Sequence, residues 1–182
     1  MKSIDRRGLV PHIVGVLVVA VTLTACSSST PGVLTQSDVP SNLGLTANPS
    51  ATASESRHVG ADPPCKKAGV TVFTVPGWRV PKGGLISSAN SPVVVNAVDA
   101  CATSSDARSA FTSAFACPRC STVEIGDEAR LIPPPVSGQR VDIVGWREGN
   151  QIGQLLVLGP ATDKRITPAL VELLARRAAA RT

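Results

Sequence analysis

The chain has 182 residues, of which 43% are hydrophobic and 17% charged, and its net charge at pH 7 is +5. This length suits one domain with a sizeable core, and the basic residues are too scattered to form the concentrated patch that binds nucleic acid. Aromatic residues make up only 3% of the chain, which argues against an extended stacking platform for bases or sugars.

The first 25 residues have the organisation of an export signal. Lys2, Arg6 and Arg7 make a basic start, and residues 13–25 follow without a charge. This run is shorter than the roughly 20 apolar residues that cross a bilayer as a helix. Its length suits the apolar core of a secretory signal, so we expect residues 1–25 to be a signal peptide.

The sequence Leu-Thr-Ala-Cys at positions 23–26 resembles the lipobox of bacterial lipoprotein precursors. The resemblance implies that the thiol of Cys26 receives a diacylglyceryl group, with acyl chains such as palmitate, and that cleavage makes Cys26 the N-terminus. Two acyl chains suffice for stable anchoring, so we expect the chain on the extracytoplasmic face of the cell membrane. The alternative is an ordinary signal peptide followed by an incidental cysteine.

Residues 26–64 are expected to form a flexible tether. They are rich in Ser, Thr, Pro, Ala and Gly, and residues 48–64 carry too few large apolar side chains to offset the entropy lost on ordering. Residues 33–45 hold several aliphatic side chains. They form an N-terminal arm, and the sequence leaves open whether it docks on the domain.

The compact domain is expected over residues 65–182 and begins with two strands. The β-branched and aromatic run at residues 69–75 and the apolar run at residues 93–101 predict these strands. Residues 82–92 between them read as a loop. Residues 103–116 then change to helical spacing and predict a helix, with a serine at position 104 or 105 as its cap.

The second half of the domain predicts further strands and a second helix. Short β-rich runs at residues 121–125 and 129–133 flank a Gly-Asp-Glu turn. Longer runs at residues 139–147 and 151–159 surround Glu-Gly-Asn, which is a hairpin signal. In residues 167–182 a threonine suited to capping precedes a proline suited to the first helical turn.

This order of elements defines the expected fold class. Hairpins without a regular alternation of strands and helices imply an antiparallel sheet. We therefore predict an α+β domain with a sheet of about five strands and two helices packed on one face. The arginines near the end of the last helix complement its dipole, and we expect them to be solvated.

Two segments carry a resemblance to a known group of proteins. Residues 125–131 read IGDEARL and residues 144–159 read VGWREGNQIGQLLVLG, and an Ala- and Leu-rich helix follows. Residues 65–182 thereby resemble actinobacterial envelope lipoprotein modules similar to the extracellular sensor domain of PknH-type receptor kinases and their DUF3558-like relatives. The resemblance implies an α+β fold, disulfides, a cell-envelope location and no general enzymatic activity.

Four cysteines follow Cys26, at positions 65, 101, 117 and 120. An even number in an oxidising compartment predicts two disulfides. Three pairings are possible, and we favour Cys65 with Cys101 and Cys117 with Cys120. A redox role for the Cys-Pro-Arg-Cys motif is disfavoured because it follows a predicted helix, whose negative end does not stabilise a thiolate. A zinc clamp is also disfavoured, because it would need two close pairs of ligands and only Cys117 and Cys120 form such a pair.

Other catalytic arrangements find little support. His58, the one histidine beyond the predicted signal peptide, lies in a polar segment, so we expect it to be solvated and to take no part in a catalytic triad. Asp127 and Glu128 are adjacent, and neighbours on an extended chain point to opposite faces. We expect them to be turn acids beside Gly126, and Asp142 to be a solvent-side strand residue.

Trp78, Trp146 and Arg147 are the candidate binding residues. Each tryptophan either belongs to the core or lines a concave patch, and a ligand would bind on the open sheet face or in a groove between sheet and helix. We expect a membrane-anchored envelope lipoprotein whose domain binds or senses an envelope ligand or protein, without catalysis, cofactor, metal or nucleic acid. The alternatives are thiol–disulfide exchange by Cys117 and Cys120, and a lipid carrier with a large apolar cavity.

Overall fold

The part of the chain that the computed structural model describes consists of residues 30–55, 59–60, 64–80, 90–132 and 139–182. The signal peptide, the acylated Cys26, the solvated His58 and most of the loop at residues 82–92 are predictions that lie outside it. Within the described residues no helix is long and apolar enough to cross a membrane.

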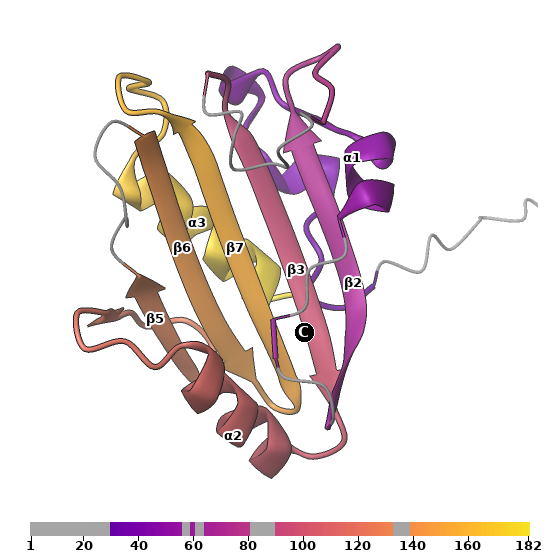
Figure 1. Cartoon of the computed structure of the whole chain (residues 1–182), viewed down its shortest axis with the longest axis vertical. Helices are drawn as coiled ribbons and strands as arrows, with labels where there is room; N and C mark the ends of the chain where they lie inside the picture. Colours follow the sequence, from indigo (N-terminus) through magenta and orange to yellow (C-terminus); the bar gives the residue numbers. More distant parts are fainter. Residues whose placement is uncertain (1–29, 56–58, 61–63, 81–89, 133–138) are drawn as a thin grey trace, which may run out of the picture.

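In the described part of the chain, one antiparallel sheet of seven strands forms the centre of the molecule, and Figure 1 shows its longer strands. Its strand order is β1-β2-β3-β7-β6-β5-β4. The antiparallel prediction is confirmed, but about five strands was too few: β1 has only two residues and leaves no pattern in the sequence, and β4 keeps only two residues of the β-rich run at 121–125. The strands are β1 Thr46–Ala47, β2 Cys65–Thr74, β3 Val93–Cys101, β4 Ser121–Thr122, β5 Glu128–Ile132, β6 Gln139–Glu148 and β7 Gln151–Pro160.

Among the described residues, three α-helices flank the sheet, and the residue before each helix caps it. Asn48, Thr103 and Thr167 each accept the backbone N–H of the residue three positions on, which satisfies a donor that the helix leaves unpaired. Thr103 therefore takes the cap that we had expected from a serine at position 104 or 105. The helices are α1 Pro49–Ser54, α2 Ser104–Ala114 and α3 Pro168–Ala179, and the 3₁₀ turns are η1 Gln36–Asp38 and η2 Ser41–Leu43.

The two longer helices pack on opposite faces of the sheet, which corrects the prediction of one shared face. Val94 and Val98 of β3 pack in the cluster that contains α3, whereas Ala97 and Cys101 pack in the cluster that contains α2. Alternate residues of a strand point to opposite faces. The unbroken apolar run of β3 needs a cover on each side, and Figure 1 shows α3 behind the sheet and α2 in front of its lower end.

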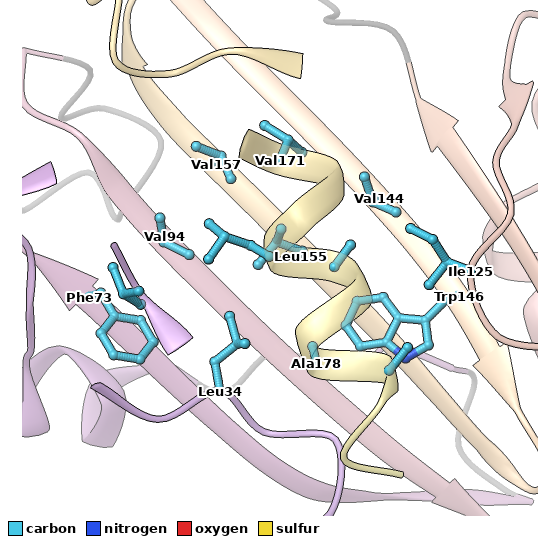
Figure 2. Packing of buried hydrophobic residues seen from close by; sticks show 14 of the residues in the cluster. Leu34, Phe73, Val94, Ile125, Val144, Trp146, Leu155, Val157, Val171 and Ala178 are labelled. Atoms are coloured by element: carbon cyan, nitrogen blue, oxygen red, sulfur yellow. The ribbon is translucent and has the colours of Figure 1, made fainter. Parts of the chain in front are cut away.

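Trp146 belongs to the core on the α3 side. Its side chain is fully buried, and Figure 2 shows the indole between Ile125 and Ala178 of α3. The ring also covers Gly153 on the neighbouring strand, where a Cβ atom would lie only 2.0 Å from an indole carbon. Of the two readings that the sequence left open for this tryptophan, the structure therefore favours the core.

The N-terminal arm docks on the same face. Five aliphatic side chains of the arm are buried against β2, β3 and α3, and Figure 2 shows Leu34 beside Phe73. The backbone N–H of Leu34 donates to Oδ1 of Asn96 at 2.7 Å, and Asn96 is itself completely buried. The arm residues in this cluster are Val33, Leu34, Val39, Leu43 and Leu45.

The arginines at the end of α3 hold the arm from the other side. Arg181 forms an ion pair with Asp38 at 3.0 Å, and Arg177 donates to the backbone carbonyl of Asp38. Partial burial raises the pKa of Asp38, but the Thr35 amide and the Arg181 guanidinium outweigh it and lower that pKa below its usual value. These two arginines thus bind protein groups, and the expectation that they are solvated is wrong for them.

The described part of residues 26–64 therefore differs from a flexible tether. Residues 33–45 are part of the core, and Pro49–Ser54 forms α1. The composition gave a wrong prediction because the five aliphatic side chains of the arm are buried against the sheet and α3. Burial of this kind needs no local periodicity in the sequence.

We predict that Leu34→Ala lowers the free energy of unfolding by about 3 kcal/mol, because it removes a fully buried side chain. Leu173→Ala is the matched control, since Leu173 is 39% exposed on α3, and it should change stability by less than about 0.5 kcal/mol. Urea titrations of both variants measure this difference. Equal stabilities would show that the arm does not pack.

Candidate functional site

A tight turn after β2 sets the position of Trp78. The N–H of Trp78 donates to the carbonyl of Val75 at 3.1 Å, and Gly77 has a φ of 77°. Proline followed by a glycine with positive φ is the pattern of a type II turn. The turn leads the chain away from the sheet and places Trp78 and Arg79 beside α1.

Asn48 connects this turn to α1. Its Oδ1 accepts the N–H of Ala51 at 3.0 Å, which caps the helix. Its Nδ2 donates to the carbonyl of Trp78 at 3.2 Å and to the hydroxyl of Thr74 at 3.0 Å. One carboxamide thereby fixes the spacing between the helix, the end of β2 and the tryptophan.

A hollow of about 540 Å³ lies between α1 and the turn. Trp78 is half-buried and packs against the apolar cluster below, whereas Arg79 and Val80 are exposed. The hollow thus offers an apolar aromatic surface next to a guanidinium, which suits a small ligand with a flat apolar part and an acceptor or anionic group. Its lining residues are Asn48, Ser50, Ala51, Gly77, Trp78, Arg79 and Val80.

The structure does not bring the three predicted binding residues together. Trp78 lines the hollow, and Trp146 lies in the core on the α3 side. Arg147 is 5% exposed, and its guanidinium donates to Asp127 at 2.6 Å and to the carbonyl of Gly149 at 3.3 Å. Through these two contacts, Arg147 stabilises the hairpin turn between β6 and β7.

The carboxylates that we weighed for catalysis hold structural positions. Asp127 also accepts the N–H of Gly149 at 3.1 Å, so it is a turn acid as expected. Glu128 is the first residue of β5 and pairs with Arg130 at 3.1 Å, so its assignment as a turn acid was wrong. Asp142 pairs with Arg140 and is only 14% exposed. It lies on the α3 side of β6, so its assignment to the solvent side was wrong.

A second hollow of about 370 Å³ lies at the end of α3. Glu124 and Glu148 line it together with Arg176, and Arg176 already pairs with Glu172 at 2.6 Å. This hollow mixes both signs of charge and contains no aromatic side chain among its described lining residues. The hollow beside Trp78 is therefore the better candidate site.

The four cysteines adopt the favoured pairing. The sulfurs of Cys65 and Cys101 lie 2.00 Å apart, and those of Cys117 and Cys120 lie 2.29 Å apart. The first pair joins the ends of β2 and β3 and is buried beneath α2. The second pair follows α2, which ends at Ala114. Within the described residues, no group of three or more acidic, histidine or cysteine side chains could hold a metal ion.

Asn48 and Arg79 were missed by the sequence analysis. Asparagine followed by proline is a signature for the start of a helix, so α1 could have been found from Asn48 and Pro49. No sequence pattern marked Arg79, because its candidate binding role depends on its position beside Trp78 in the hollow.

Comparisons with known proteins do not supply a family. No protein-family model matches the chain, and no curated protein is significantly similar to it. Function is therefore inferred from the sequence and the site alone.

We predict that Trp78 accounts for most of the quenching of the protein's fluorescence by acrylamide. The chain has two tryptophans, and Trp146 is fully buried whereas Trp78 lines an open hollow. Trp78→Phe should remove most of the quenching and leave a blue-shifted emission, and Trp146→Phe should do the reverse. Unchanged quenching in Trp78→Phe would mean that the hollow is closed to small solutes.

Proposed function

We propose that this chain is a membrane-anchored lipoprotein of the cell envelope whose domain binds a small ligand without transforming it. The proposal has two parts, the anchor at Cys26 and the binding site beside Trp78. The order of the basic start, the apolar run and Leu-Thr-Ala-Cys supports the first part. The resemblance to extracytoplasmic sensor modules is consistent with both parts.

The observation that carries the binding proposal is the hollow between α1 and the turn at residues 75–78. Trp78 and Arg79 differ in chemistry and lie side by side in its lining. The capping bonds of Asn48 prepare their positions, so little order has to be gained when a ligand binds. Preorganisation of this kind is what makes a small contact area sufficient for useful affinity.

The lining of the hollow also supports binding without catalysis. Its described polar side chains are an asparagine, a serine and an arginine. A general base that works near neutral pH is most often a histidine, a carboxylate or a lysine. The described lining thus offers donors and an apolar surface, which are the groups that hold and orient a ligand.

Native mass spectrometry of the full chain, extracted from its own membrane in mild detergent, tests both parts together. The natural protein should carry a diacylglyceryl group and a co-purifying small molecule. Cys26→Ala should lose the acyl mass and the membrane association. Trp78→Ala should keep the acyl mass and lose the small molecule, and Leu173→Ala, a change at an exposed site on α3, should behave as the natural protein does.

Each part can fail separately. Membrane retention and processing of Cys26→Ala that match the natural protein would refute the anchor. A natural protein that carries no small molecule, or a Trp78→Ala variant that still carries it, would refute the binding site. A bound diacyl lipid would instead indicate a carrier, and insulin reduction that requires Cys117 and Cys120 would indicate thiol–disulfide exchange.

A further inference from the structure

The docked arm leaves a very short stalk between the proposed anchor and the domain. Only residues 27–29 separate Cys26 from Thr30, which begins the described arm. Thr30 already contacts β2, since a Cβ atom at Gly69 would lie 2.9 Å from Thr30 Cγ2 and 2.6 Å from Val33 Cγ2. The chain is therefore held against the sheet from its first described residue.

The length of this stalk limits how far the domain can lie from the membrane. Four residue steps from Cys26 to Thr30 span at most about 14 Å when fully extended. A coil running from residue 26 to residue 64 would have a root-mean-square length of about 35 Å. With the anchor in the bilayer, the surface around Thr30 must therefore lie within about 14 Å of the anchored end of the chain.

The surface beside Thr30 is the outer edge of β2. From Cys65 to Thr71 no strand among the described residues pairs with this edge, because β1 reaches only Phe73 and Thr74. Lys66 and Lys67 are exposed there. The ammonium group of Lys67 donates to the backbone carbonyl of Glu55 at 2.8 Å. Lys66 is three residues from Gly69, so its Cα lies about 10 Å along the strand.

We propose that the anchored domain rests on the membrane with the outer edge of β2 turned towards it, so that Lys66 and Lys67, which leave opposite faces of β2 and flank that edge, both lie near anionic lipid headgroups. This inference rests on the proposed anchor at Cys26. The surface potential of an anionic membrane acts over about one Debye length, which is about 8 Å at physiological salt. The short stalk keeps both lysines close to that layer, where their charge is attracted.

A lipid surface fits this edge better than a second copy of the chain does. Two copies joined through β2 would add strand to strand, and exposed lysines on an edge strand oppose such pairing. The same two positive charges are complementary to anionic headgroups. The short stalk left by the docked arm also places this edge near the membrane. A dimer formed through the edge would not depend on the length of the stalk.

Lysine acetylation on vesicles tests the orientation. The full lipoprotein is reconstituted into vesicles of phosphatidylcholine and phosphatidylglycerol and treated with a membrane-impermeant acetylating reagent, and each lysine is followed by mass spectrometry. The matched variant carries about 20 Gly and Ser residues between Ser29 and Thr30, a coil of about 25 Å. Lys164 is the internal control because it is exposed beyond the end of β7, at the opposite end of the sheet.

Lys66 should react about three times more slowly in the natural protein than in the lengthened variant, since only the short stalk holds it within a Debye length of the headgroups. Lys164 should react equally in both. Equal rates for Lys66 in two acylated proteins would overturn the orientation and leave the anchor intact. A Cys26 without an acyl group would refute the anchor and this inference with it. Slower reaction of Lys66 that depends on protein concentration, in both proteins alike, would show a dimer instead.

Discussion

A hydrogen bond inside the core, from the backbone N–H of Leu34 to the carboxamide of Asn96, joins the N-terminal arm to β3, an interior strand of the sheet. Asn96 is completely buried on β3, so the oxygen of its side chain needs a partner to offset the water that it loses. Its Nδ2 lies 3.4 Å from the carbonyl of Gln154, a long contact. Removing the arm would leave the acceptor without its closest donor.

The docked arm determines both functional proposals. On the α3 side it completes the cover over Phe73, Val94 and Val98. The helices α1 and α2 cover the other face. It also leads the chain into α1, whose cap holds Trp78 in place. Because the arm starts at the edge of β2, the same packing that builds the hollow brings the proposed anchor close to the domain.

The sequence predicted the regular elements that carry a local signal. β3 has the predicted bounds, the hairpin of β6 and β7 surrounds the predicted turn, and α3 begins after its predicted threonine cap. These elements were accessible because strand composition, turn chemistry and capping are properties of neighbouring residues. The favoured cysteine pairing also agrees with the structure, although three residues of spacing for one pair gave the only local hint.

The sequence could not show properties that depend on partners far along the chain. An apolar stripe says that a helix is buried but not on which face of the sheet, so α2 and α3 were wrongly placed together. The burial of β3 on both faces, visible in its unbroken apolar run, was the available clue. The two tryptophans look alike in sequence, and only the register that sets Trp146 opposite Gly153 distinguishes a core residue from a site residue.

Hydrogen–deuterium exchange at the amide of Leu34 tests the central claim most directly, because this N–H reports the bond to Asn96 and nothing else in the arm. If the arm is part of the core, the Leu34 amide should exchange as slowly as the amides at the middle of β3, and only through opening of the whole domain. If the amide exchanges at the rate of an unstructured peptide while β3 stays protected, the arm is a loose tether, and the short stalk and the orientation on the membrane are both wrong.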